Sequence, residues 1–215
     1  MKTLIIIAGP NGAGKSTTSA AHLEQFGITA FDFDKEYYSK WAQFDFDPLV
    51  GQGVRDSTAD LFIELQQKAI RENESFSFET NFNNANLLLP HINRFREKGY
   101  QVDLIFLYLD SPEHAIARVK QRVANKGHNV PEEQILERYR MGLEVLDSHF
   151  EEFDYITLFK SDDNNMYPLI TFLPLEKQIA KEHRPMLEEL KHKLPNLTSF
   201  IVSIKSDLEK KELKT

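Results

Sequence analysis

The sequence predicts an α/β fold in which helices flank a parallel five-stranded sheet and a C-terminal extension follows. Two observations predict it. Short runs rich in β-forming residues alternate with helical stretches along most of the chain, as in a parallel sheet covered by helices. The first run, Thr3–Ala8, is apolar on both faces and leads directly into a glycine-rich loop, which is typical of a central parallel strand.

The other elements follow in chain order. The glycine-rich loop opens a helix over about residues 14–25, which Gly27 ends. A second strand over 28–33 closes on Asp34, and a third over 75–78 closes on Glu79. Further strands are expected over 102–109 and 155–159, and helices over about 56–71, 85–98 with an interruption near Pro90, 112–124 and about 131–150.

The length of 215 residues suits one α/β domain with an appendage. We expect a domain over residues 1–174 and an extension over 175–215 that is partly helical. Residues 169–172 are expected to return as a strand and 176–183 to form a helix, whereas 200–204 fit either state. Residues 205–215 are mostly charged and are expected to be frayed.

The composition excludes several classes of function. The chain has 26 basic and 33 acidic residues, which argues against a general nucleic-acid binder because such proteins usually present a basic face. The absence of cysteine excludes disulfides, thiolate metal sites and cysteine nucleophiles. The apolar run at residues 4–8 is too short for a signal peptide or a membrane span, and we expect a cytoplasmic protein without membrane contact.

Residues 9–17, GPNGAGKST, form the motif that carries the most chemistry. They satisfy the pattern G-x-x-x-x-G-K-[ST] of a P-loop, with the required strand before it and helix after it. Backbone N–H groups face the phosphates, Lys15 neutralises their charge and Ser16 places its hydroxyl on Mg²⁺. The alternative is a glycine-rich turn that fits by chance. The residues expected to hold a nucleoside triphosphate are Gly9, Asn11, Gly12, Ala13, Gly14, Lys15, Ser16 and Thr17.

Acidic residues end three predicted strands, where open parallel sheets bind ligands. Asp34 is expected beside the γ-phosphate, to orient or deprotonate an acceptor hydroxyl and to touch Mg²⁺. The alternative for Asp34 is an N-cap for a helix that starts at Lys35. Asp32 lies one pleat further from the strand end and suits this role less well. Asp110 resembles a Walker B aspartate, but the sequence of residues 110–113 favours a helix cap.

Glu79 and Thr80 close the third strand with a carboxylate and a hydroxyl, which suit substrate hydroxyls or a hydrated metal. The alternative is a strand end with a local cap. The amides of Asn81, Asn83 and Asn84 follow, and they suit either a substrate contact or a turn.

Arginines predict a second part of the site. Arg118 and Arg122 are four residues apart and share a helix face, from which they can clamp phosphate oxygens. The polar loop at 125–131 suits a lid, which we place around residues 112–149. His128 in this loop and Arg138 in the next helix are candidate substrate contacts. The alternative for all four is a solvated surface position.

In this order, several blocks resemble the zeta-toxin-like P-loop kinases, also described as predicted ABC-type ATPases. The blocks are residues 9–17, an aspartate ending the next strand, FET at 78–80, LDSPE at 109–113, ARVKQRV at 117–123, GHNVPEE at 127–133 and RY at 138–139. The resemblance covers about residues 1–160 and implies an adenylate-kinase-like P-loop NTPase fold. It also implies that ATP and Mg²⁺ serve to phosphorylate a sugar hydroxyl of UDP-N-acetylglucosamine.

The resemblance assigns roles to individual residues. Asp34 matches the residue that activates the acceptor, and Glu79 and Thr80 match acceptor-binding positions. Arg118 and Arg122 match helix arginines that meet phosphates. The resemblance also raises an antitoxin protein as a partner, which nothing in the sequence itself shows.

We therefore expect a small-molecule kinase whose catalytic residues are Lys15, Asp34, Arg118 and Arg122. The alternative is an ATP-binding regulatory or interaction module that hydrolyses ATP slowly, has no small acceptor and uses the C-terminal residues as a partner surface. A kinase acting on nucleic-acid ends is disfavoured by the acidic charge balance.

Overall fold

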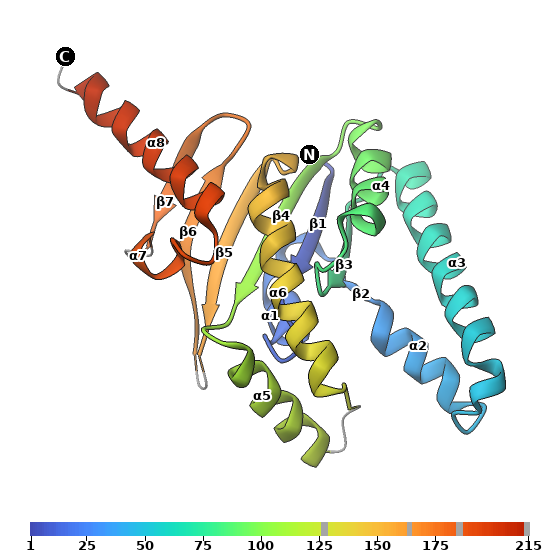
Figure 1. The fold of residues 1–215 in the computed structure, drawn as a ribbon. Helices are drawn as coiled ribbons and strands as arrows, with labels where there is room; N and C mark the ends of the chain where they lie inside the picture. The colour runs from blue at the N-terminus through green and yellow to red at the C-terminus, as the bar shows by residue number, and fades with distance from the viewer. Residues whose placement is uncertain (126–128, 163–164, 184–186, 213–215) are drawn as a thin grey trace.

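A seven-stranded sheet of order β2-β3-β1-β4-β5-β6-β7 organises the chain (Figure 1). The structure is a computed structural model that describes residues 1–125, 129–162, 165–183 and 187–212. The strands are β1 Thr3–Ala8, β2 Phe31–Asp32, β3 Phe76–Thr80, β4 Gln101–Tyr108, β5 Tyr155–Ser161, β6 Met166–Leu173 and β7 Gln178–Glu182. The first five strands pair in parallel, and β6 and β7 continue the sheet in antiparallel register.

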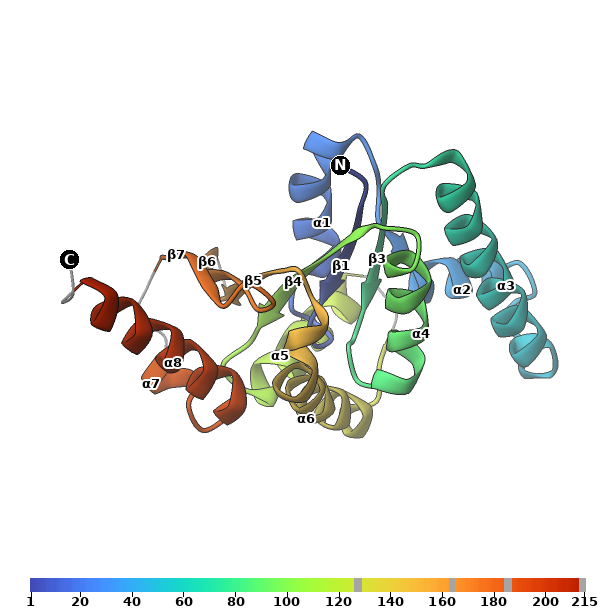
Figure 2. The same cartoon turned by 90° about the horizontal axis from the view of Figure 1, so that it is seen from above.

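Helices cover both faces of this sheet. In Figure 2, α1 lies on one face and α4, α5 and α6 lie on the other, while α2 and α3 stand beyond the β2 edge. The helices are α1 Lys15–Leu23, α2 Phe33–Ala42, α3 Pro48–Glu72, α4 Ala85–Arg96, α5 Pro112–Ala124, α6 Glu132–His149, α7 Leu187–Leu190 and α8 Pro195–Glu212. No helix in these described ranges is long and apolar enough to cross a membrane.

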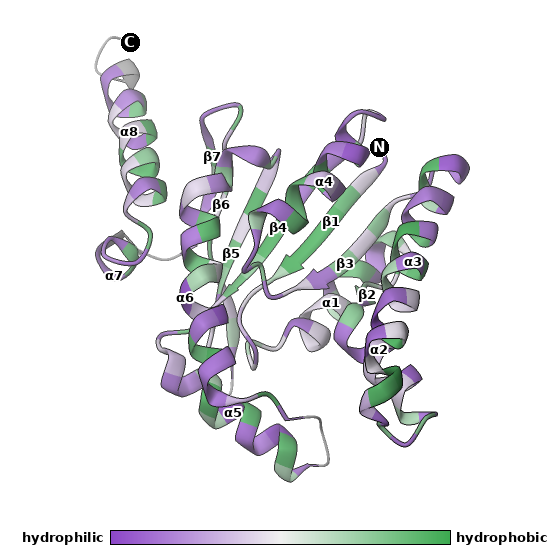
Figure 3. Ribbon diagram, turned by 45° about the vertical axis from the view of Figure 1, so that its right-hand side comes forward, coloured by the Kyte–Doolittle hydropathy of each residue, from purple (hydrophilic) through white to green (hydrophobic). Residues whose placement is uncertain are grey.

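The hydrophobic core lies in the central strands, as the hydropathy colouring in Figure 3 shows. Every residue of β1 is buried, and β1 runs between β3 and β4. The central position of Thr3–Ala8, the α/β class and the parallel arrangement of the first five strands are therefore confirmed. The sheet has two strands more than the five predicted for the parallel core. β6 contains residues 169–172, which were expected to return as a strand, and β7, which was not expected, pairs with β6.

The segment between β1 and β3 differs most from its prediction. The second strand ends at Asp32 instead of continuing to residue 33, because the Asp32 side chain accepts a hydrogen bond from the Lys35 amide and caps α2. Asp34 consequently lies in the first turn of α2. The following helix begins earlier than predicted, at Pro48, because Asp47 caps it and a proline at the first position suits a helix start.

The C-terminal part of the chain belongs to the same body as the rest. Residues predicted as a helix over 176–183 instead contain β7, whose backbone pairs with β6 after a turn at Pro174. The segment 200–204 lies within α8, which continues to Glu212 where frayed residues were expected. Asp147 of α6 accepts hydrogen bonds from the amides of Asn196 and Leu197, so α6 holds the start of α8.

Pro90 does not interrupt its helix. α4 runs through it from Ala85 to Arg96, with Asn84 as the N-cap. Leu88, Ile92 and Phe95 are buried along one face, and this burial against the sheet offsets the hydrogen bond that the proline cannot make.

Candidate active site

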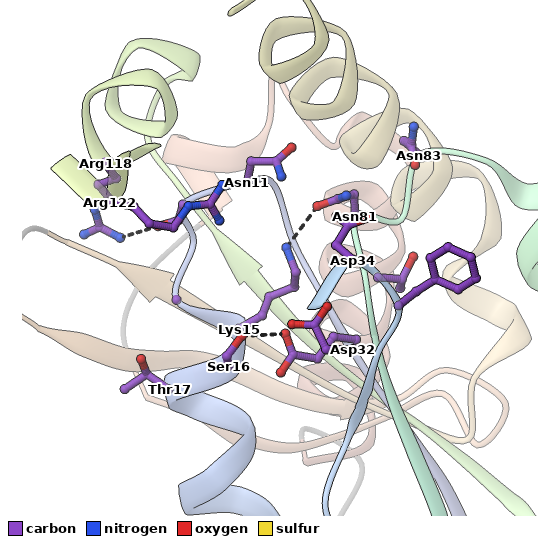
Figure 4. Close-up of a pocket in the computed structure, with 15 residues that line it drawn as sticks. Asn11, Lys15, Ser16, Thr17, Asp32, Asp34, Asn81, Asn83, Arg118 and Arg122 are labelled. Carbon is purple, nitrogen blue, oxygen red and sulfur yellow. Dashed lines mark hydrogen bonds between the residues drawn. The ribbon is translucent and has the colours of Figure 1, made fainter. Parts of the chain in front are cut away.

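A cavity of about 450 Å³ opens at the carboxyl ends of β1, β2 and β3 (Figure 4). This end of an open parallel sheet is where ligands bind. Figure 4 shows Lys15 in the middle, with the α5 arginines on one side and the α2 aspartate on the other. The lining residues are Asn11, Gly12, Gly14, Lys15, Ser16, Thr17, Asp32, Phe33, Asp34, Glu79, Thr80, Asn81, Asn83, Arg118 and Arg122.

The loop between β1 and α1 is shaped by its glycines. Gly9 has a φ of 146°, and a Cβ there would lie 2.5 Å from the carbonyl oxygen of Leu107 on β4. Gly14 has a φ of 88° and precedes the first residue of α1. Only glycine adopts both conformations without strain, so the backbone can curl closely around phosphate oxygens.

Hydrogen bonds fix the side chain of Lys15 in the phosphate loop. Its Nζ donates to the carbonyl oxygens of Gly9 at 2.8 Å and Pro10 at 3.2 Å, and to Oδ1 of Asn81 at 3.0 Å. Burial lowers the pKa of Lys15 to about 8, although the carboxylate of Glu79 acts to raise it. Asn81 thus joins the site as a partner of the lysine, a role that sequence reasoning had not given it.

This pKa predicts how phosphate binding depends on pH. Lys15 binds phosphate only as the ammonium ion, and bound phosphate favours that charged form. Affinity for ATP should therefore be nearly constant below pH 8 and should fall as the pH rises above the pKa of the free protein. Titrating ATP binding between pH 7 and pH 9.5 should show a loss of roughly 30-fold. The Lys15→Met variant is expected to bind ATP weakly at every pH, with no comparable decline in affinity. An ATP affinity of the wild-type protein that does not change with pH would contradict the prediction.

Glu79 lies against the phosphate loop. One of its carboxylate oxygens accepts from Ser16 Oγ at 3.0 Å, and the other accepts from Ser19 Oγ at 2.9 Å. Burial raises the pKa of Glu79, and the two serine hydrogen bonds oppose that shift. The sequence left two uses open for this carboxylate, contact with a substrate hydroxyl or with a hydrated metal. Its hydrogen bond with Ser16, the residue expected to place its hydroxyl on Mg²⁺, favours the metal. Thr80 next to it lines the cavity and accepts from the Phe82 amide at 3.0 Å.

Asp32 and Asp34 both line the cavity, although only Asp34 was favoured from the sequence. The early end of β2 brings both carboxylates to the sheet edge, one as the last residue of the strand and one in the first turn of α2. Arg122 lies opposite them, and its positive charge interacts with both. Burial lowers the pKa of Arg122, while the aspartates oppose that shift.

The two α5 arginines have different surroundings. Arg118 donates to the carbonyl oxygen of Gly12 at 3.2 Å, to Ser161 Oγ at 2.7 Å and to the carbonyl oxygen of Asp162. It therefore ties the phosphate loop to the β5–β6 turn. Arg122 lies one turn further along α5, on the side of the aspartates.

Only one of the two substrate contacts predicted for the lid lies within the described residues. Arg138 of α6 reaches the phosphate loop, where its Nη1 donates to Asn11 Oδ1 at 3.3 Å. His128 lies outside the residues that the structure describes. Asp110 is not part of the described cavity lining, and it is not the cap of α5 either. Ser111 caps that helix by accepting from the His114 amide at 3.3 Å. It takes this position because α5 begins at Pro112, and the N-cap is the residue directly before the first helical one.

A second cavity of about 1030 Å³ adjoins the first. The two share Ser16, Asp32 and Glu79, which form the wall between them. Apolar side chains line much of the second cavity, among them Leu23 of α1, Ile28 before β2, Phe31 of β2 and Leu65 of α3. No pattern in the sequence indicated this space, because its walls come from elements far apart in the chain.

A phosphate loop opening α1, set in this sheet with carboxylates at the adjoining strand ends, defines a P-loop kinase. The sequence model of the Zeta toxin family matches residues 1–169, and the chain belongs to that family. No curated protein sequence matches it significantly.

Two solved structures show the same fold. The PezAT chromosomal toxin–antitoxin system of Streptococcus pneumoniae contains a chain that superposes with a TM-score of 0.58 at 17% identity, over 94% of this chain and 88% of that one. A chain of the AvrRxo1-ORF1:-ORF2 structure with ATP superposes with a TM-score of 0.62 at 14% identity, over 90% of this chain and 63% of that one. At such identities the likeness concerns the fold.

Proposed function

We propose that this protein is an ATP-dependent kinase that transfers the γ-phosphoryl group to a hydroxyl of a nucleotide sugar, with UDP-N-acetylglucosamine as the first acceptor to test. The observation that carries the proposal is the arrangement of one cavity. A phosphate loop with its lysine, a carboxylate on the loop serine and two carboxylates on the α2 side all face the same space. Phosphoryl transfer needs these groups, because it depends on positioning and on charge stabilisation.

ATP with Mg²⁺ is the donor that fits the described residues. The likeness to a structure that holds ATP supports this choice. Within the described ranges, no group of three or more His, Asp or Glu side chains is placed to hold a metal ion. Mg²⁺ needs only one or two protein oxygens when phosphates and waters supply the rest, and Ser16 with its partner Glu79 offers them. When bound there, the ion would neutralise charge on the β- and γ-phosphates.

Each of these residues then has its own role in the reaction. Asp34 orients the acceptor hydroxyl and accepts its proton while the hydroxyl oxygen bonds to the γ-phosphorus. The bond from that phosphorus to the bridging oxygen breaks, and ADP leaves. Lys15 of the phosphate loop and Arg122 of α5 stabilise the negative charge on the transferred group. Arg118 fixes the loop, and Arg138 closes over it from α6.

The acceptor side of the cavity suits a sugar. Thr80 and Asn83 present a hydroxyl and an amide there, and such groups bind sugar hydroxyls. The adjoining cavity gives additional room, so the combined space exceeds the volume of a single-ligand pocket. We further propose that residues 112–149 act as a lid within a catalytic domain at residues 1–174. We also propose that the protein works in the cytoplasm, where ATP is found, and that it has an antitoxin-type protein partner, as in the PezAT toxin–antitoxin system.

The proposal is tested by incubating the protein with ATP labelled at the γ-phosphate and a panel of sugars, nucleotide sugars, nucleosides and amino alcohols. The expected result is transfer of label to one acceptor, with a strong preference for nucleotide sugars. Nucleic-acid ends are included as a control and should remain unlabelled. Tight ATP binding with slow hydrolysis and no labelled acceptor would instead favour a regulatory module.

A further inference from the structure

The C-terminal extension meets the body of the protein through a charged cluster at the end of β4. The cluster consists of Tyr108, Asp110, Lys160, Glu189 and Lys193. Lys160 Nζ lies 2.8 Å from Asp110 Oδ1 and 2.6 Å from Glu189 Oε1. Its side chain is only 15% exposed, whereas those of Asp110 and Glu189 are 39% and 37% exposed, so the lysine end of each contact is the buried one.

Lys193 completes the cluster from the extension. Its Nζ donates to the hydroxyl of Tyr108, which is buried, and to the backbone carbonyl oxygen of Asp110. Asp110 is therefore held twice, through its side chain by Lys160 and through its backbone by Lys193. The next residue is the N-cap of α5, so both contacts act where α5 leaves the sheet.

α5 is also held along its length. Ala115 and Val119 are buried in the core, Arg118 binds the phosphate loop and the β5–β6 turn, and Lys120 pairs with Glu132 of α6. The contacts of Asp110 act before the first turn, where α5 leaves the sheet, and they add to the others in fixing the direction of its axis. Arg122 lies beyond Arg118 and faces the catalytic aspartates, so its position depends on that direction.

We infer that the extension is part of the catalytic apparatus, and that Lys193 and Glu189 are positioning residues that fix α5 and thereby place Arg122. This inference rests on the proposed kinase function. Arg122 lies about 15 Å along the helix from Pro112, at about 1.5 Å per residue. A tilt of about 5° at the start of α5 therefore shifts it by roughly 1 Å, and a displacement of that size is costly in a transferring site.

The test compares Lys193→Ala with Lys191→Ala in the full-length protein. Lys191 is a matched control, because it lies on the same segment and makes only an exposed pair with Glu188. Lys193→Ala should lower kcat about tenfold with little change in KM for ATP, whereas Lys191→Ala should leave both unchanged. Lys193→Arg, which keeps the donors, should restore most of the rate. In an Arg122→Ala background, Lys193→Ala should have almost no further effect.

An equal loss of rate in the Arg122→Ala background would overturn the inference, because it would show that Lys193 acts on stability alone. Should Lys193→Ala not fold, Lys193→Met keeps the length of the side chain and removes only its donors. Hydrogen exchange of the amides at residues 112–118 is independent of any turnover. It should accelerate in the Lys193 variants even if no kinase activity is found, and unchanged exchange would also overturn the inference.

Discussion

Replacing Lys15 by methionine should reduce phosphoryl transfer by about 10³-fold, one of the two largest effects expected from a single substitution in this protein. Methionine has a similar length and fills the same space, so the change removes the ammonium group rather than the side chain. The loss should fall mainly on kcat, since charge builds up on the γ-phosphate as the bridging bond breaks. ATP affinity should also fall, because the lysine contacts phosphate in the ground state.

The measurement is single-turnover transfer at saturating ATP, with thermal unfolding as a check on the fold. Lys15 makes hydrogen bonds to the carbonyls of Gly9 and Pro10 in the unliganded loop. Those carbonyls belong to buried residues and lose their donor in the variant, so we also expect a measurable loss of thermal stability. Asn81→Ala is an instructive companion, because it removes the side chain that orients Lys15 without removing its charge. A Lys15→Met protein that retained more than a tenth of the wild-type rate would contradict the assigned role.

Replacing Asp34 by asparagine should reduce transfer by roughly 10³-fold, within the range that a general base contributes. Asparagine keeps the shape of the side chain but cannot accept the proton of the acceptor hydroxyl. ATP binding should be unchanged, because the phosphate loop is intact. The expected result is therefore a protein that binds the donor normally and transfers it very slowly.

Asp32 provides the matched control for this substitution. It lines the same cavity two residues away, and its structural role is to cap α2 by accepting from the Lys35 amide. Asparagine caps helices as well as aspartate does, so Asp32→Asn should preserve the fold and change the rate only severalfold. A loss for Asp32→Asn as large as that for Asp34→Asn would assign the proton transfer to Asp32 instead.

The sequence was most informative where chemistry is encoded locally. The spacing of Gly9, Gly14, Lys15 and Ser16 predicted a loop between a buried strand and a helix, and the structure has that loop, because such a loop is defined by its own residues. The order and type of most elements followed from hydrophobic periodicity for the same reason.

The sequence was least informative where a role depends on pairing between distant segments. Asp32 came into the cavity because β2 is two residues long, and that length reflects a competition between sheet pairing and a helix cap. Glu79 became a partner of Ser16 through the register of β1 with β3. The strand at 178–182 is formed by residues whose own pattern suggested a helix, and its pairing with β6 outweighs that preference.

The central place of β1 has a consequence for synthesis of the chain. Leu4 is synthesised well before its two neighbours in the sheet, Phe76 and Val102. At a translation rate of about 5–20 residues per second, the apolar strand waits several seconds before both sides can be covered. During that time it is an uncharged and unpaired β-forming segment on a growing chain. Such a segment is a binding site for chaperones and can start aggregation. The strands at the other end of the sheet are joined by short turns and can pair as soon as they are made.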